Sequence, residues 1–176
     1  PSLLSFGSGK ESVTTHNDNA FIKMTSRLNT GSGSWSEQLI TPQGLLWNRA
    51  AVGGINYETI HMIALTAPIG NGGTLYNGLD GALLYFRSDN EGLTWNIQGV
   101  QLPTLNSINF PGFTGDNYAI TAQANTVVIA YFNDWGDSFI LKSSDNGDNW
   151  TRTTFLDFPV DNYIIDQGID LDNNGV

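Results

Sequence analysis

Short runs of β-branched and aromatic residues recur along the chain, and polar turn residues separate them. No stretch of ten or more residues repeats apolar side chains at the i, i+3, i+4 spacing of an amphipathic helix. The runs predict strands, because these residue types favour an extended, half-buried backbone. They cover residues 20–26, 59–66, 82–88, 126–132, 139–143 and 151–155.

Four Asn-Gly pairs lie among or beside these runs, at positions 71–72, 77–78, 146–147 and 174–175. Asn-Gly supplies the positive φ angles that tight hairpin turns need. The pattern therefore predicts an all-β, antiparallel protein with an insertion at residues 67–80.

An internal repeat links two of the predicted turns. Residues 88–95 have the sequence SDNEGLTW and residues 143–150 have the sequence SSDNGDNW, which we refer to as the Ser88 turn and the Ser143 turn. A weaker copy with extra residues, SRLNTGSGSW, occupies residues 26–35. Each copy follows a predicted strand, and the final tryptophans, Trp35, Trp95 and Trp150, are 60 and 55 residues apart.

A period of this length, holding about four short strands, is typical of a propeller blade. We predict a β-propeller of four-stranded antiparallel blades, of which about three are present as a partial ring. The blades are expected at residues 1–40, 41–98 and 99–158, with the start of a further blade at 159–176. Because natural propellers have ~4–8 blades, we expect the chain to be part of a larger propeller.

The spacing of the repeat predicts a self-bonded turn. Ser and Asp or Asn side chains fold back onto backbone N–H groups, Gly takes a left-handed conformation, and Trp packs between adjacent sheets. Structural roles are therefore predicted for Ser88, Asn90, Gly92, Trp95, Ser143, Asp145, Gly147 and Trp150.

The Ser143 turn resembles the Asp-box, or BNR repeat, at every defining position, and the Ser88 turn resembles it with Asn90 in place of Asp. Such boxes mark the sialidase-like β-propeller superfamily. The resemblance spans the chain and implies a propeller fold. It also implies that the boxes are structural turns at the blade periphery, away from the ligand face.

Three other segments are similar to large secreted bacterial propeller proteins of the type IX secretion class. They are WNRAAVGG at 47–54, NGGTLYNGLDGALLYFRS at 71–88 and FTGDNYAI at 113–120. This resemblance implies a secreted or cell-surface, extracytoplasmic location in a bacterium. It also implies a partner in the secretion machinery or on the cell surface.

The composition excludes several classes of partner and site. Among 176 residues, seven Lys and Arg stand against seventeen Asp and Glu, a formal charge of −10, which disfavours nucleic acid and anionic membrane surfaces. The longest strongly apolar run, at 127–132, is far shorter than the ~20 residues of a membrane span. The absence of cysteine excludes disulfides, thiolate nucleophiles and Cys-ligated zinc.

The sialidase resemblance implies three arginines around a carboxylate, a Tyr–Glu nucleophile pair and an Asp acid. Arg27, Arg87 and Arg152 flank the repeated turns. Only Arg49, in the short segment before the inner strand of the second blade, is therefore expected near the propeller axis. The Phe/Tyr-Arg-Ile/Leu-Pro motif of sialidases is absent from the first forty residues. We therefore favour a noncatalytic module for glycan or protein binding or for scaffolding. The alternative is a sialidase-like glycoside hydrolase with most catalytic residues outside this segment.

Besides Arg49, four residues are candidates for a ligand face. Asp116 and Tyr118 open the inner strand of the third blade, where the superfamily places ligand contacts. Asp134 and Trp135 join two strands and could present an aromatic sugar platform. For all four residues we favour ordinary turn and strand-edge roles over ligand contacts.

Cofactor signals are weak. His61 is expected to be a half-buried strand residue, and we predict no cofactor. Asp170, Asp172 and Asn174 repeat the first half of a calcium loop, although the same pattern is common in hairpin turns.

Overall fold

The computed structural model describes residues 3–10, 20–27, 34–41, 44–133 and 136–157, and these confirm the all-β prediction. The helical content of these residues is a single 3-10 turn, η2 (Ile69–Asn71), in the predicted insertion, and none of their helices could cross a membrane. The strands are β1 (Leu3–Lys10), β2 (Ala20–Arg27), β3 (Ser36–Thr41), β4 (Leu45–Gly53), β5 (Thr59–Thr66), β6 (Leu83–Ser88), β7 (Ile97–Gln101), β8 (Tyr118–Gln123), β9 (Thr126–Tyr131), β10 (Ser138–Ser143) and β11 (Thr151–Leu156).

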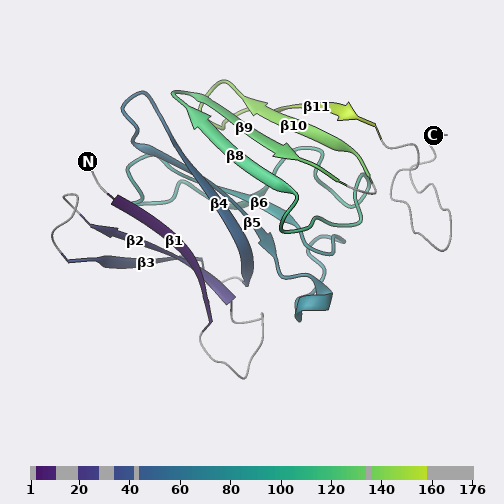
Figure 1. Ribbon diagram of the computed structural model, residues 1–176, viewed down its shortest axis with the longest axis horizontal. Coiled ribbons are helices and arrows are strands. Elements are labelled where there is room, and N and C mark those ends of the chain that lie inside the picture. The colour runs from purple at the N-terminus through teal and green to yellow at the C-terminus, as the bar shows by residue number, and fades with distance from the viewer. Residues whose placement is uncertain (1–2, 11–19, 28–33, 42–43, 134–135, 158–176) are drawn as a thin grey trace.

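The strands form three antiparallel sheets in which each strand pairs with its sequence neighbour. The first sheet has the order β1-β2-β3, the second β4-β5-β6-β7 and the third β8-β9-β10-β11. Figure 1 shows the sheets arranged as successive layers, with β4 of the second sheet beside β8 of the third. The second sheet runs to Gln101, past the predicted boundary at 98, and the blade boundaries stay predictions.

The second sheet is covered on both faces. Every residue of β5 is buried, whereas β9 in the third sheet alternates between buried and partly buried positions. One continuous apolar cluster extends from Ile22 and Met24 in the first sheet to Tyr131 and Phe139 in the third. A single sheet cannot bury both of its faces alone, so the second sheet depends on both neighbours.

An aromatic cluster closes the space between the second and third sheets. Phe110 and Phe113 come from the long connection between β7 and β8, and their ring centroids are 4.9 Å apart. Phe113 meets Tyr131 edge-on at 5.1 Å, and Phe110 lies 5.5 Å from Phe139. Aromatic pairs at these separations add to the stabilisation from area burial alone.

His61 is fully buried, which corrects the expectation of a half-buried residue. The sequence pattern shows one strand at a time, and it misses the third sheet that covers this face of β5. The imidazole Nδ1 lies 2.7 Å from the Tyr85 hydroxyl. A Cβ added at Gly53 would lie 3.0 Å from the imidazole Nε2 and 3.0 Å from the Cβ of Ala122 in β8.

Burial lowers the pKa of His61 to about 4, and the positive charge of Arg87 acts in the same direction. A hydrogen bond with the Asn146 side chain opposes the shift. Both main causes disfavour the imidazolium, so His61 is neutral in the folded protein at neutral pH.

We predict that His61 makes folding sensitive to mild acid. The unfolded histidine binds a proton near pH 6.5 and the folded one near pH 4, so stability falls as pH drops from about 6.5 towards 4. Between pH 7.5 and 4.5 the loss is about 2–3 kcal/mol for this group. Urea unfolding at both pH values should show it.

The variant His61→Gln should lose correspondingly less stability over the same pH interval, which separates His61 from the many carboxylates. His16→Gln measures the contribution of the other histidine. If native protein and His61→Gln respond equally to pH, the buried imidazole is not responsible.

Candidate functional site

Three of the predicted ligand-face residues come together where the first strands of two sheets meet. Arg49 lies in β4, Asp116 just precedes β8, and Tyr118 is the first residue of β8. A backbone hydrogen bond of 2.8 Å from the Gly54 N–H to the Ala124 carbonyl joins the other ends of these strands. The two inner strands therefore lie side by side along their length (Figure 1).

Trp47 links these side chains. The Tyr118 hydroxyl donates a 2.6 Å hydrogen bond to the Trp47 carbonyl. The Arg49 guanidinium lies 5.8 Å from the Tyr118 ring centroid, and its Nη2 is 3.9 Å from the Asp116 Oδ1. We call Trp47, Arg49, Asp116 and Tyr118 the inner-strand cluster.

Trp47 has an unusual backbone. Its φ of 49° is left-handed, a conformation that is uncommon for a bulky residue. The pairing of β4 with β5 shifts register between Leu46 and Arg49, so Trp47 lies in a β-bulge. A Cβ at Gly115 would lie 2.5 Å from the indole, so the ring rests against that glycine.

Sequence reasoning missed Trp47 as a site residue. The signal was present, because Leu45, Leu46 and Trp47 are three consecutive apolar residues at the start of a strand. Such a break in the alternation of a strand is compatible with a bulge, which re-aims a side chain. The contact with Gly115 is nearly seventy residues away in sequence and left no local signal.

The cluster combines a buried hydroxyl with exposed charges. Tyr118 is buried, which raises the pKa of its phenol, so it remains a protonated hydrogen-bond donor. The side chains of Arg49 and Asp116 are 43% and 98% exposed, so their ion pair is weak. Trp47 is 38% exposed as a whole residue, and together the three residues offer donors, an acceptor and an apolar ring to a ligand.

The remaining candidates lie outside the described residues. They are Asp134, Trp135, Asp170, Asp172 and Asn174. Within the part of the chain that the structure describes, no group of three or more His, Asp or Glu side chains could hold a metal ion. The weak calcium pattern at Asp170, Asp172 and Asn174 is therefore not tested.

The hydrogen bonds of the repeated turns run as their spacing predicts. The Ser143 hydroxyl oxygen accepts hydrogen bonds of 2.8 Å from the Gly147 N–H and 3.3 Å from the Asp145 N–H. The corresponding distances in the Ser88 turn are 2.8 Å from Gly92 and 3.4 Å from Asn90. Both serine side chains are buried inside their own turns.

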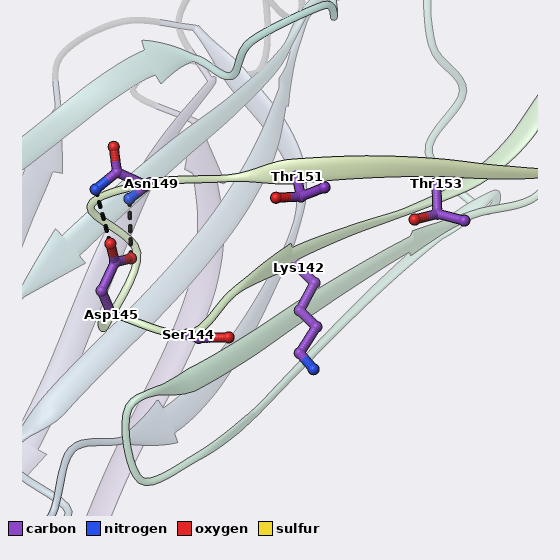
Figure 2. Close-up of a pocket in the computed structure, with 6 residues that line it drawn as sticks. All are labelled: Lys142, Ser144, Asp145, Asn149, Thr151 and Thr153. Carbon is purple, nitrogen blue, oxygen red and sulfur yellow. Dashed lines mark hydrogen bonds between the residues drawn. The ribbon is translucent and has the colours of Figure 1, made fainter.

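Asp145 and Asn90 bond to equivalent backbone groups. The Asp145 Oδ1 accepts a 2.9 Å hydrogen bond from the Asn149 N–H, and the Asn90 Oδ1 accepts a 2.8 Å bond from the Thr94 N–H. The Asn149 side-chain amide also donates a 2.7 Å hydrogen bond to the Asp145 Oδ2, and both contacts are drawn in Figure 2. Hydrogen bonds from Asn149 and from Ser143 lower the pKa of Asp145 to about 2.

The turn glycines dock each sheet on the preceding one. Gly92 and Gly147 have φ angles of 85° and 89°, and each follows another left-handed residue. A Cβ at Gly147 would overlap the Tyr85 hydroxyl of the second sheet, and one at Gly92 would overlap Met24 of the first. Trp150 meets the Tyr85 ring edge-on at 5.2 Å. This geometry supports a structural role for both turns.

A polar hollow of about 440 Å³ lies on the outer side of the third sheet (Figure 2). Two strands and the Ser143 turn supply its walls. The residues that line it are Lys142, Ser144, Asp145, Asn149, Thr151 and Thr153. None of the predicted ligand-face residues belongs to it.

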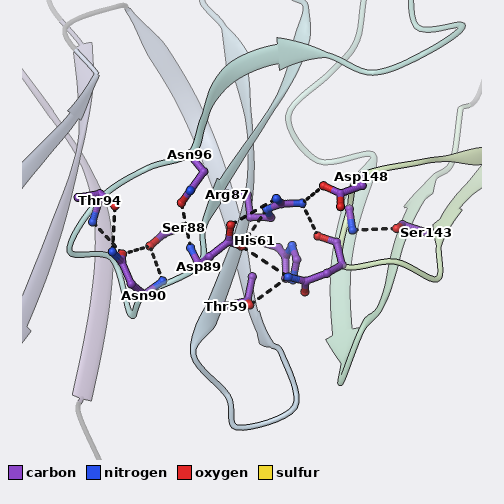
Figure 3. Close-up of polar contacts among 12 residues, drawn as sticks. Thr59, His61, Arg87, Ser88, Asp89, Asn90, Thr94, Asn96, Ser143 and Asp148 are labelled. Carbon is purple, nitrogen blue, oxygen red and sulfur yellow. Dashed lines mark hydrogen bonds and ion pairs between the residues drawn. The ribbon is translucent and has the colours of Figure 1, made fainter.

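Arg87 is committed to the contact between the second and third sheets (Figure 3). Its Nη1 donates hydrogen bonds of 2.8 Å to the Asn146 carbonyl and 2.6 Å to the Asp148 Oδ1. Its Nε lies 2.9 Å from the Asp89 Oδ1. Only 12% of the Arg87 side chain is exposed, so it is not available to a ligand.

Arg152 is also committed. Its Nη2 lies 2.6 Å from the Asp137 Oδ2, and the guanidinium lies 5.0 Å from the Phe110 ring centroid and 4.9 Å from that of Phe139. The side chain of Arg27 is outside the described part of the structure. Among the arginine side chains that are described, Arg49 alone lies on an inner strand.

No protein-family model and no curated protein matched this chain. Solved structures of sialidases did. Two are of Trypanosoma rangeli sialidase, one in complex with sialic acid and one with 2,3-difluorosialic acid as a covalent intermediate, with TM-scores of 0.53 and 0.54. Each is 14% identical over 86% of this chain and 28% of the sialidase.

The K499G mutant of NanB sialidase from Streptococcus pneumoniae matches with a TM-score of 0.48 and 16% identity, over 78% of this chain and 19% of NanB. At these identities the likeness to the Trypanosoma rangeli enzyme shows the fold alone. The chain spans little more than a quarter of the sialidase chain. Its three antiparallel sheets thus resemble blades of a sialidase propeller, as the repeat predicted.

We predict that Ser143→Ala destabilises the protein by about 1–3 kcal/mol, because the buried Gly147 N–H loses its acceptor. Ser144→Ala is the matched control, since Ser144 is the exposed neighbour in the same turn. Urea unfolding should show a lower midpoint for Ser143→Ala and little change for Ser144→Ala. Equal midpoints for the two variants would contradict a structural role for Ser143.

Proposed function

We propose that this chain is a noncatalytic, glycan-binding part of a larger secreted or cell-surface β-propeller, and that the inner-strand cluster contacts the glycan. One observation carries the proposal, which is the left-handed bulge that holds the partly exposed Trp47 indole beside Arg49 and Asp116. A bulky residue in this conformation costs on the order of 1–3 kcal/mol. Such strain is concentrated at functional sites.

The cluster suits a sugar ring chemically. A pyranose presents an apolar face of C–H groups and a rim of hydroxyls. The indole offers an apolar surface, while the Arg49 guanidinium donates and the Asp116 carboxylate accepts hydrogen bonds. Tyr118 lies beneath them and contributes by holding the Trp47 carbonyl.

The arginines favour binding over hydrolysis. Bidentate pairing with a ligand carboxylate requires free guanidinium groups, and Arg87 and Arg152 are both engaged with aspartates of the protein. The inner-strand cluster holds one carboxylate, Asp116, whereas glycoside hydrolysis uses a pair. The alternative is a sialidase-like hydrolase whose site is completed by residues of other blades. The likeness of the fold to that of sialidases supports this alternative.

Location and partners form part of the same proposal. The resemblance of three segments to secreted bacterial propeller proteins supports an extracytoplasmic location and a partner in the secretion machinery or on the cell surface. The strongly acidic composition supports a neutral ligand over a polyanionic one.

Binding is measured on an array of neutral and sialylated oligosaccharides. For any glycan that the native protein binds, Trp47→Ala should lower the affinity by at least about tenfold. The matched control is Trp35→Ala, which removes the indole of another exposed tryptophan, 44% exposed, outside the cluster. If no glycan binds the native protein, or both variants bind as it does, the cluster is not a glycan site.

Gly115→Ala tests the orientation of the indole without removing it. The new methyl group would lie 2.5 Å from Cδ2 and 2.8 Å from Cγ of Trp47 and would displace the ring, so glycan affinity should fall. The unfolding midpoint, measured in parallel, gives the stability that the displacement costs. Gly70→Ala is the control, because nothing lies within 4 Å of a Cβ at that position. Equal affinity of the two variants would argue against indole stacking.

The hydrolase alternative predicts turnover of a fluorogenic sialoside, and we expect none. Turnover that Arg49→Ala abolishes would favour the hydrolase, since Arg49 is the described arginine near the inner strands.

A further inference from the structure

The second and third sheets carry corresponding residues on the same face, which in the second sheet points towards the third. Arg87 and Lys142 each immediately precede the serine of a repeated turn, and both are basic. Arg87 pairs with His61 across β6 and β5, and Lys142 pairs with Val128 across β10 and β9. Two residues earlier, Tyr85 corresponds to Ile140.

Corresponding positions differ in burial. Tyr85 and His61 are fully buried because the third sheet covers them. Ile140 is 37% exposed, and Val128 is partly buried. The same face is therefore covered in the second sheet and open in the third.

The two basic side chains also differ in their contacts. Arg87 reaches across to the third sheet, where it binds the Asn146 carbonyl and the Asp148 carboxylate. Lys142 is exposed, and no described residue bonds to its ammonium group. The hollow of about 440 Å³ lies beside Lys142, on the face where a following turn would lie (Figure 2).

We propose that this hollow is the docking site for a turn of a following sheet of the same repeat. That turn would present a backbone carbonyl and a carboxylate to Lys142, as Asn146 and Asp148 present them to Arg87. The partner chemistry is thus an acidic turn of the Ser-x-Asp-x-Gly-x-x-Trp kind. The inference rests on the proposed larger propeller, but not on glycan binding by the inner-strand cluster.

Carbodiimide coupling tests the docking directly, because this reagent joins an amine to a carboxylate that is in contact with it. The experiment uses the full polypeptide that the source organism makes. Lys142 should couple to an Asp or Glu of a following repeated turn, identified by peptide mass spectrometry. Lys23 and Glu37, whose charged atoms are 3.1 Å apart, provide an internal positive control. If the Lys23–Glu37 product forms and no Lys142 product does, the proposal fails.

Amine acetylation and charge reversal provide a second test on the same polypeptide. A docked Lys142 should be acetylated more slowly than Lys23, and Lys142→Glu should lower the Tm by setting two carboxylates together. Lys142→Arg should keep the native Tm, because Arg87 makes the equivalent contacts. Rapid acetylation of Lys142 with an unchanged Tm for Lys142→Glu would overturn the docking, whatever the Trp47 variants show for glycans.

Discussion

The contact between Gly147 and the Tyr85 hydroxyl determines how the second and third sheets meet. Any side chain at position 147 would overlap the phenol, and the left-handed pair Asn146–Gly147 brings the backbone close enough for the contact. The Trp150 ring then covers the edge of Tyr85. With this spacing set, His61 is sealed beneath the turn, Arg87 reaches Asp148, and β8 lies beside β4.

The inner-strand cluster depends on that arrangement but obeys different local rules. In the turns, left-handed positions fall on Gly92 and Gly147, where glycine makes them favourable. In the cluster the left-handed position falls on a tryptophan, which local preference opposes. A Tyr118 hydrogen bond from the neighbouring sheet and the gap at Gly115 hold it there. Conflict between local preference and the observed backbone is most often found where function requires it.

Local sequence signals predicted β2, β5, β6, β9, β10 and β11 from their residue types, whereas β4 was not predicted. They also predicted the internal bonds of the repeated turns, which join residues at most four positions apart. Asp116 and Tyr118 were expected at the start of the third inner strand, where they lie, whereas Arg49 was expected before the second inner strand and lies within it, in β4. Trp47 was missed because its conformation is imposed by Gly115 and Tyr118, residues from another sheet. The full burial of His61 was missed for the same reason, since its cover is the neighbouring sheet.

Because positive charge is scarce in this chain, we expect each basic side chain to pair with an acidic one. Seven Lys and Arg face seventeen acids, so a cation finds a carboxylate readily. Among the described side chains, Lys23 pairs with Glu37, Arg49 with Asp116, and Arg152 with Asp137, while Arg87 holds Asp89 and Asp148 together. Lys142 departs from this pattern within the described residues, although it occupies the position that Arg87 has in the second sheet. In so acidic a chain, an exposed cation at a repeated interface position is best explained by an acidic partner that packs on that face.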